Sequence, residues 1–328
     1  MRQGPFQPIR GARPARAGCW KNAPCLMDAN MSRKESEMVK LLDREILTRE
    51  VTEWKGLHLF HAHFSSCSQK VRLVLAEKGI AWQSHPIDLG ANENISERYL
   101  GINPRGLVPA LVDDGDVHIE SNDIIFHLED KFPQPVLIPA ANRGEAEAIL
   151  RAEDDLHLDI RNVTFHFLFE TPAPPKSAKD LENYRRFGAS TVAGEPDAQK
   201  EKEIRYWRTY GEQRVSQADA RKSVAALGRA FAGVEARLAD SDYLFGAELT
   251  IIDIAWFIYA HRMVLAGYPL AAQHPAMGAW YKRLSNRPGW ATEITMPPPL
   301  AAVIERHQQR LTKEGHSITQ VCGMTAAG

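Results

Sequence analysis

The chain has 328 residues, of which 44% are hydrophobic and 25% are charged, and its 40 Lys and Arg nearly balance 41 Asp and Glu. This composition is typical of a globular protein, and the length suffices for two domains that each bury a core. The charge balance gives no electrostatic reason to expect nucleic acid or an anionic membrane as a partner. The most apolar window, residues 251–260, is short and is interrupted by Asp253, so we expect no membrane-spanning segment.

Neither the cysteines nor the histidines predict a metal site. The spacing of the four cysteines fits neither a disulfide framework nor a zinc site, and a reducing cytosol is the simplest compartment for them. His61 and His63 would share one face of a strand, but His58 would point the other way, which leaves two ligands without a third. We therefore expect no metal. The cysteines are Cys19, Cys25, Cys67 and Cys322.

Residues 1–54 are predicted to be an N-terminal extension that is largely disordered. Residues 1–27 contain five basic residues and no acidic one, as a transit peptide does, but they are rich in Pro and Gly and lack helical amphipathicity. We expect either a disordered extension or a translation start at Met31.

From residue 55 to residue 134, strand and helix patterns alternate and predict a small mixed α/β domain. Short apolar or aromatic runs indicate strands, and apolar residues at helical spacing indicate helices. Asp114-Gly115 is a strong hairpin signal between two strands, and Ser121 is a plausible helix N-cap. The predicted strands are residues 57–64, 81–89 and two within 107–120, and the predicted helices are residues 68–79, 95–100 and 121–132.

Beyond a proline-rich linker at residues 135–141, helical periodicity dominates and predicts an all-helical domain over residues 142–313. An insertion at residues 171–196 is interrupted by Pro and Gly. Thr250 and Asp253 form a capping-box variant at the start of an apolar helix. Residues 314–328 are predicted to be a flexible tail.

The stretch SSCS stands between the first predicted strand and its helix, and contains Ser65, Ser66 and Cys67. A helix N-terminus offers free N–H groups and partial positive charge, which stabilise a thiolate, either that of Cys67 or that of a ligand. Lowering a thiol pKa from about 8.5 by two units needs ~2.7 kcal/mol, which one charge-assisted hydrogen bond and the dipole can supply. The simpler interpretation is a serine N-cap followed by a small buried Cys67.

Two further motifs have the chemistry to hold a peptide. Val108-Pro109 precedes a strand, and a cis bond there would leave the backbone N–H and C=O of Val108 free to pair with an extended peptide. Glu120-Ser121 lies where a strand ends and a helix begins, so the hydroxyl suits a carboxylate and the acid suits an ammonium. Taken alone, Ser121 is more simply a helix cap.

The order and spacing of these motifs resemble the glutathione transferase superfamily over about residues 55–295. This resemblance implies a thioredoxin-like N-terminal domain, an all-α C-terminal domain, glutathione as co-substrate, and a cytoplasmic homodimer. It implies that Ser65 or Ser66 activates the glutathione sulfur with Cys67 beside it. It further implies that Val108, ahead of a cis Pro109, pairs with the tripeptide, and that Glu120 and Ser121 hold its γ-glutamyl end.

Two longer stretches carry a finer resemblance. SSCS before a helix is similar to the zeta class, and FHAHFSSCSQKVRLVLAEKG and YLFGAELTIIDIAWFIYAHRMVLAGYP resemble the bacterial hydroquinone reductive dehalogenases. In that branch the motif cysteine attacks a glutathione thioether, and a mixed disulfide remains for a second glutathione to resolve. The resemblance thus implies a glutathione-dependent enzyme that attacks a small, aromatic electrophile, with reductive dehalogenation through Cys67 as its finer activity.

Other functions stay open. INPRGLVPALVDDGDVHIES and EIRYWRTYGEQRVSQADARKSV resemble the glutathione-dependent β-aryl etherases, against which Cys67 counts because the most similar etherases lack the SSC triplet. Maleylacetoacetate isomerases share the zeta-like motif but lack a comparable insertion. A glutathione-binding module without turnover, and a metal-dependent enzyme using the histidines, are the remaining classes.

The electrophile site is expected between the domains, against the first helices of the second domain. His157, Arg161, Phe165 and Phe169 recur there at helical spacing. The simpler interpretation is an amphipathic core stripe, with His157 a surface or core residue rather than a catalyst. The insertion and a helix near residues 299–313 could cover the site.

Overall fold

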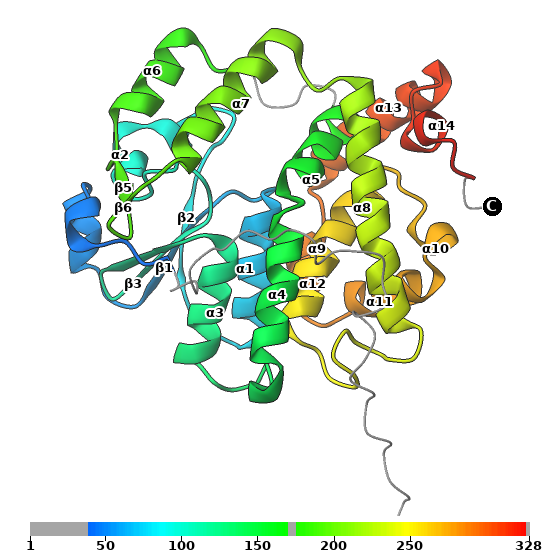
Figure 1. The fold of residues 1–328 in the computed structure, drawn as a ribbon, viewed down its shortest axis with the longest axis horizontal. Helices are drawn as coiled ribbons and strands as arrows, with labels where there is room; N and C mark the ends of the chain where they lie inside the picture. Colours follow the sequence, from blue (N-terminus) through cyan, green and yellow to red (C-terminus); the bar gives the residue numbers. More distant parts are fainter. Residues whose placement is uncertain (1–38, 170–174, 326–328) are drawn as a thin grey trace, which may run out of the picture.

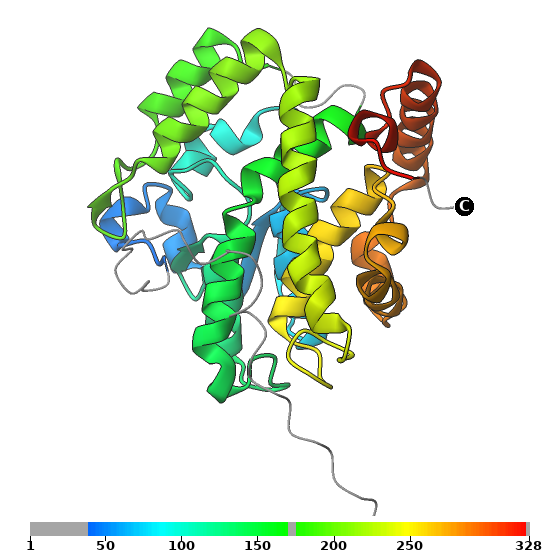
Figure 2. The ribbon, with the colours of Figure 1, turned by 45° about the vertical axis from the view of Figure 1, so that its right-hand side comes forward.

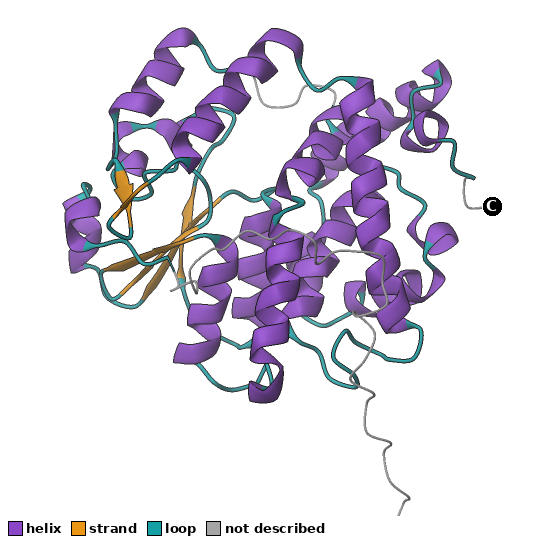
Figure 3. Cartoon of the chain, viewed as in Figure 1, coloured by secondary structure: helices purple, strands orange, loops and turns teal. Residues whose placement is uncertain are grey.

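The computed structural model describes residues 39–169 and 175–325, and Figure 1 shows a small sheet with its helices beside a larger set of helices. The main sheet has four strands in the order β2-β1-β3-β4, drawn in orange in Figure 3. β1 pairs with β2 in parallel, whereas β1–β3 and β3–β4 are antiparallel. The strands are β1 Leu57–His61, β2 Gln83–Pro86, β3 Ala110–Asp113 and β4 Asp116–Ile119.

Both faces of this sheet are covered, so all five residues of β1 are buried although two of them are histidines. Leu59 lies on the face that packs against α1 and α3, and Phe60 lies on the opposite face with Tyr99 of α2. A strand buried on both faces loses the alternation of apolar and polar residues. The three helices are α1 Ser66–Glu77, α2 Glu97–Leu100 and α3 Ser121–Lys131.

The predicted hairpin at Asp114-Gly115 is confirmed, and both residues have positive φ, at 51° and 94°. This conformation suits the tight two-residue turn that Asp-Gly favours. The predicted N-cap role of Ser121 is wrong, since Ser121 is the first residue of α3. Glu120 occupies the N-cap position with a φ of 67°, and its side chain makes no capping hydrogen bond.

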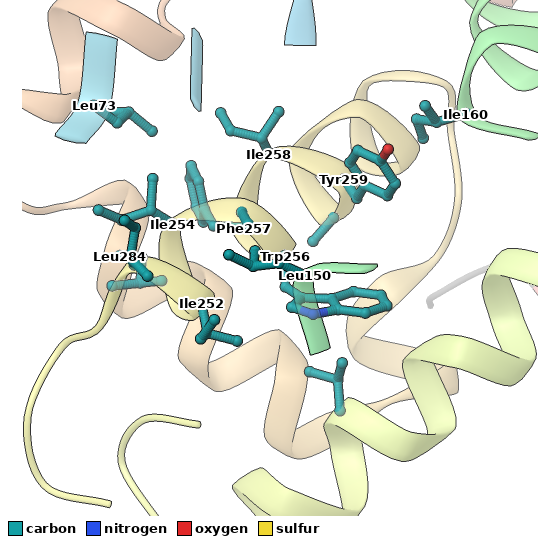
Figure 4. Close-up of a cluster of buried hydrophobic side chains, with 14 of the residues drawn as sticks. Leu73, Leu150, Ile160, Ile252, Ile254, Trp256, Phe257, Ile258, Tyr259 and Leu284 are labelled. Carbon is teal, nitrogen blue, oxygen red and sulfur yellow. The ribbon is translucent and has the colours of Figure 1, made fainter. Parts of the chain in front are cut away.

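The second domain is mostly helical and is built around α9, in which 13 residues are buried. A helix that is apolar all round belongs inside a core. Figure 4 shows α9 side chains meeting Leu73 of α1, Leu150 of α4 and Ile160 of α5, so the two domains share one core. The helices are α4 Arg143–Asp154, α5 His157–Val163, a π-helical turn Thr164–Leu168, α6 Ala178–Arg186, α7 Gln199–Gln213, α8 Gln217–Leu238, α9 Ile251–Leu265, α10 Leu270–Gln273, α11 Pro275–Ser285, α12 Trp290–Ile294, α13 Pro298–Glu314 and α14 Ile318–Cys322.

The predicted capping box at the start of α9 is confirmed. Asp253 Oδ2 accepts hydrogen bonds from the backbone N–H and the hydroxyl of Thr250, at 2.9 and 2.7 Å. Its other oxygen accepts from Leu244 N and Trp280 Nε1. Because all these donors reach it, this carboxylate is satisfied although it is fully buried.

Two domain predictions need correction. The insertion contains α6 and a small hairpin, β5 Thr191–Val192 with β6 Glu195–Pro196, so the second domain is not entirely helical. The C-terminal residues 314–325 are not a flexible tail, because α14 packs against α8 and buries Ile318 to 2% exposure. Figure 2 shows α14 in red beside the long α8, and residues 326–328 lie outside the described residues.

The predicted disorder of the N-terminal extension is wrong for residues 39–54. Leu41 N donates to Val117 O at 2.9 Å, and Ile119 N donates to Val39 O at 3.1 Å, so this segment covers the free edge of β4. Covering a sheet edge satisfies groups that would otherwise be exposed. Residues 1–38, with Cys19, Cys25 and Met31, lie outside the described residues.

Glu45 joins this segment to the insertion. Its carboxylate, only 1% exposed, accepts hydrogen bonds from the Thr191 hydroxyl and from the backbone N–H groups of Ala193, Gly194 and Leu42. Burial opposes ionisation, but these hydrogen bonds together lower the pKa of Glu45 below its ordinary value of 4.5. Glu45 is therefore a buried anion that holds the hairpin.

Replacing Glu45 by Gln is expected to lower the free energy of unfolding by about 1.5–3 kcal/mol, because several charge-assisted hydrogen bonds are lost. The folded-state pKa is depressed, so the stabilisation is complete above the unfolded pKa. It disappears as pH falls through the lower folded pKa. Urea unfolding at several pH values measures both effects.

The control is Glu50→Gln, because Glu50 pairs with Arg98 at an exposed site and should contribute less than about 1 kcal/mol. Equal stability of Glu45→Gln and the native chain at pH 7 would contradict the prediction.

Within residues 39–169 and 175–325, no helix has both the length and the apolar character that crossing a membrane requires.

Candidate functional site

The sheet topology brings the three sequence motifs to one end of the first domain. β1 and β4 both run antiparallel to β3, so the ends of β1 and β4 and the start of β3 lie together. SSCS follows β1, Val108-Pro109 precedes β3, and Glu120-Ser121 follows β4. α1 and α3 consequently both begin at this end, and their free N–H groups favour an anionic ligand.

Both serines of the first motif keep a hydroxyl proton that can be donated. Ser65 is the N-cap of α1, and its Oγ accepts a hydrogen bond from Ser68 N at 3.2 Å. A hydroxyl that accepts through a lone pair can still donate its proton. Ser66 is the first residue of α1, and its hydroxyl makes no hydrogen bond within the described part of the chain. The capping role of Ser65 is thus compatible with a role in binding a thiolate.

Cys67 is half-buried and has polar partners from both domains. Its sulfur lies 3.6 Å from Nδ1 of His157, and the Ser121 side chain lowers its pKa, which links the first and third motifs. Burial raises the pKa of the Cys67 thiol, with the Glu153 carboxylate adding to the effect and the Lys70 ammonium opposing it. Cys67 is therefore protonated at neutral pH. The thiolate that the helix N-terminus stabilises is then that of a ligand.

Val108 and Pro109 have the backbone geometry that the resemblance implies. The bond between them is cis. The pairing of β3 with β1 starts one residue later, at Ala110 opposite Phe60, so Val108 lies outside the ladder. Among the described residues, the backbone N–H and C=O of Val108 make no hydrogen bond, which leaves them available to a ligand.

Glu120 is oriented by Arg105, a residue that the sequence did not single out. Glu120 Oε1 accepts from Arg105 Nη1 at 2.6 Å, and its other oxygen makes no hydrogen bond to the described residues. Arg105 also forms a two-point pair with Asp197, which directly follows the insertion, at 3.0 and 2.8 Å. One carboxylate oxygen of Glu120 is thus held in place while the other remains available to an ammonium.

Arg262 of α9 supplies positive charge next to the SSCS turn. It is 3% exposed, and donates hydrogen bonds to the Phe64 carbonyl and the Gln69 side chain. No carboxylate of the described residues lies within ion-pair distance of it. Burial lowers the pKa of Arg262 to about 10, while interaction with Cys67 opposes this shift, so it stays charged at neutral pH. The signal in the sequence was a basic residue inside a very apolar helix.

The stripe begins on α5 with His157 and Arg161, continues beyond it with Phe165 and Phe169, and contacts α7 and Phe64 just before the SSCS motif. Arg161 pairs with Glu203 of α7 at 2.9 Å. Phe165 packs against Trp207 with ring centroids 6.1 Å apart, and Phe169 packs against Phe64 at 6.2 Å. The four side chains are half-buried, Phe169 also packs against the larger apolar core, and the stripe lies beside the candidate site. The core positions of this segment are Ile160, Val163, Phe167 and Leu168.

The histidines considered for a metal site point to separate partners. His58 contacts His85 at 3.0 Å, and His61 contacts Arg72 and Ser84 at 3.1 and 2.8 Å. His63 is exposed. Over the described ranges, no three His, Cys, Asp or Glu side chains form a group that could hold a metal ion.

Two family models match the chain. The N-terminal domain of glutathione S-transferase matches residues 59–136, and the C-terminal domain of glutathione S-transferase matches residues 202–283. The maleylacetoacetate isomerase of Pseudomonas aeruginosa is 28% identical, over 67% of this chain and 93% of that protein. A zeta-class glutathione S-transferase of Euphorbia esula is 42% identical, but only over 26% of this chain and 37% of that protein.

Among solved structures, the β-etherase LigF from Sphingobium sp. strain SYK-6 superposes with a TM-score of 0.61. It is 26% identical, and the match covers 72% of this chain and 98% of that one. The matched regions contain the motif-bearing sheet and the helices α7 to α11. The chain therefore belongs to the glutathione S-transferase superfamily, with a thioredoxin-like domain and a helical domain, and is a glutathione-dependent transferase with glutathione as co-substrate.

Proposed function

We propose that this protein binds glutathione at the end of the sheet where the three motifs meet. The γ-glutamyl carboxylate lies at Ser121 and the N-terminus of α3, and its ammonium pairs with the free oxygen of Glu120. The backbone of Val108, ahead of the cis Pro109, pairs with the tripeptide. The sulfur then lies at the start of α1, where the hydroxyl of Ser65 or Ser66 donates to its thiolate. The convergence of these groups at one sheet end supports this arrangement.

The proposed substrate is a small, electrophilic aromatic molecule, and the reaction is reductive dehalogenation of a chlorinated hydroquinone. The glutathione thiolate first forms a carbon–sulfur bond to the ring and chloride leaves. The thiolate of Cys67 then attacks the glutathione sulfur of this thioether. The ring carbon takes the electron pair and a proton, and a Cys67–glutathione disulfide is formed. A second glutathione breaks this disulfide, which gives oxidised glutathione and returns Cys67.

The observation that carries this proposal is the position of Cys67. It lies on the first turn of α1, one residue after Ser66 and two residues after Ser65, and its sulfur lies 3.6 Å from His157 Nδ1. A nucleophile there can reach a sulfur held by Ser65 or Ser66. Plain conjugation would need the serines but would make no use of a cysteine.

The test follows chloride release from a chlorinated hydroquinone with excess glutathione, for the native protein and for Cys67→Ser. The native protein is expected to release chloride and the reduced ring together. Cys67→Ser is expected to release chloride and to accumulate the glutathione conjugate, with formation of reduced ring at least about 100-fold slower, because the thiol-exchange step has no nucleophile. Equal yields of reduced ring from both proteins would contradict the role of Cys67.

β-Aryl ether cleavage is a second candidate, favoured by the structural similarity to a β-etherase. In this reaction the glutathione thiolate displaces an aryloxide, so Cys67→Ser should turn over as fast as the native protein. Isomerisation of a maleylacetoacetate-type substrate is a third candidate, favoured by the similarity to the maleylacetoacetate isomerase of Pseudomonas aeruginosa. A binding module would bind glutathione and consume none with any electrophile.

From the family alone, we also infer a cytoplasmic homodimer. Light scattering should give twice the chain mass of 36.7 kDa. A mass of 36.7 kDa at micromolar concentration would contradict the inferred dimer.

A further inference from the structure

Cys67 and His157 form a contact between the two domains. Cys67 is on the first turn of α1, His157 is the first residue of α5, and 90 positions separate them. The sulfur and the imidazole Nδ1 are 3.6 Å apart, within hydrogen-bond distance for sulfur. Both side chains are half-buried, so the contact is partly shielded from water.

The surroundings of His157 determine which ring nitrogen carries the proton. Its Nε2 lies 3.4 Å from Nη2 of Arg161, and a guanidinium can only donate hydrogen bonds. Nε2 must therefore accept, and a neutral imidazole then carries its proton on Nδ1, which faces the Cys67 sulfur. Burial and the Arg161 charge both lower the pKa of His157, which keeps the ring neutral at pH 7.

Arg161 is itself held in a fixed place. Glu203 of α7 accepts from Arg161 Nη1 at 2.9 Å, and the guanidinium lies 4.7 Å from the ring centre of Tyr206. Since Arg161 is paired on one side and stacked on the other, the imidazole that it contacts has one favoured tautomer and orientation.

We propose that His157 is a catalytic residue that donates its Nδ1–H hydrogen bond to the Cys67 sulfur, and that Arg161 is the positioning residue that sets this tautomer. The proposal rests on the proposed thiol-exchange function. When Cys67 attacks the thioether, the hydrogen bond stabilises its thiolate. When a second glutathione thiolate attacks the mixed disulfide, the Cys67–sulfur bond breaks and its electron pair returns to Cys67. The same N–H then stabilises this leaving thiolate, and water supplies the proton that restores the thiol.

The charges around Cys67 make such a donor necessary. Lys70 on α1 and Arg262 on α9 favour the thiolate, whereas burial and the carboxylates of Glu153 and Asp154 on α4 oppose it, and the net effect raises the pKa of Cys67. The Lys70 ammonium is also shared with Glu153 through two contacts of 2.8 Å. Among the described residues, His157 is the side chain at hydrogen-bond distance from this sulfur, at 3.6 Å.

The test uses Cys67 as its own probe and needs no electrophilic substrate. In the full chain with Cys19, Cys25 and Cys322 replaced by Ser, Cys67 is the only cysteine. The rate of its reaction with 2,2′-dithiodipyridine is measured across pH. Replacing His157 by Leu is expected to move the thiolate titration up by about one pH unit and to slow the reaction at pH 7 by about tenfold. His157→Asn, which keeps an N–H donor near the position of Nδ1, should recover most of this loss.

A second measurement examines the leaving thiolate. Cys67 is loaded with glutathione by oxidised glutathione, and its release by excess glutathione is followed by mass spectrometry. His157→Leu is expected to slow this release about tenfold, because the leaving thiol has a higher pKa. Thermal unfolding checks that the variants remain folded. A pH profile and release rate unchanged in His157→Leu would overturn the inference. Failure of the proposed function would give a different result. The native protein would release no chloride from the chlorinated hydroquinone, while His157→Leu would still raise the pH of the Cys67 thiolate titration.

Discussion

Removing both hydroxyls of Ser65 and Ser66 by substitution with Ala is expected to raise the pKa of bound glutathione by one to two units. A hydrogen bond to a charged group contributes about 1.5–3 kcal/mol, and each pKa unit corresponds to 1.36 kcal/mol. Reaction with a general electrophile at pH 7 should slow by about 10- to 100-fold, because a smaller fraction of the bound thiol is ionised. The ultraviolet absorbance of the thiolate, titrated with saturating glutathione, measures the pKa directly.

The single variants separate the two serines. Ser65 caps α1 by accepting from Ser68 N, so Ser65→Ala should also lower the free energy of unfolding by about 1 kcal/mol. Ser66 makes no such bond, so Ser66→Ala should leave stability nearly unchanged. The variant that raises the pKa identifies the thiolate donor.

Ser96 provides a matched control for the loss of a cap. It caps α2 by accepting from Tyr99 N at 3.2 Å, the distance also found at Ser65. Ser96→Ala should lower stability as Ser65→Ala does, and should leave the pKa of bound glutathione unchanged. If the double serine variant also leaves that pKa unchanged, neither hydroxyl activates the thiol, and the proposed role of the serines is wrong.

The loss of Glu153 is expected to have the largest effect on stability. Lys70 Nζ of α1 lies 2.8 Å from both carboxylate oxygens of Glu153 of α4, and the two side chains are 1% and 0% exposed. Glu153→Ala leaves the ammonium buried with Asn122 as its remaining hydrogen-bond partner. Such an unpaired buried charge costs about 3–5 kcal/mol. Urea unfolding at pH 7 measures the loss.

The double variant Lys70→Met with Glu153→Leu distinguishes the cost of an unpaired charge from the value of the pair. Replacing a buried ion pair by apolar residues of similar size is often neutral or stabilising, so this variant should be much more stable than Glu153→Ala. The exposed pair of Arg98 and Glu50 serves as a control, since its loss should cost less than about 1 kcal/mol. A double variant as unstable as Glu153→Ala would contradict the explanation by charge burial.

The sequence predicts those parts of the structure whose conformation depends on residues close together in the chain. The turn at Asp114-Gly115 needs positive φ at both positions, and few residue pairs adopt it as readily. The capping box of Thr250 and Asp253 closes within one helical turn. The alternation of short strands and helices, followed by helices alone, likewise follows from local periodicity.

Two of the incorrect predictions fail for separate physical reasons. Residues 39–54 were expected to be disordered because nothing local orders them, yet they cover the edge of β4 and bury Leu41 and Val51. Ser121 is a residue type that favours the N-cap position, but α3 begins so soon after β4 that Glu120 occupies that position. For residues 39–54 a distant part of the chain supplies the deciding contact, whereas at Ser121 the backbone path between two adjoining elements decides.

The sequence by itself determined the order of the elements and the three motifs that carry the resemblance to the superfamily. Only the tertiary structure decided which other side chains contact and orient the residues of these motifs. Arg105 meets Asp197 across 92 positions and orients Glu120, and His157 meets Cys67 across 90. Arg262 of the buried helix α9 adds its positive charge next to the SSCS motif, where it contacts the Phe64 carbonyl. These contacts depend on how the insertion and α5, α7 and α9 pack against the first domain, and no local pattern of residues encodes such packing.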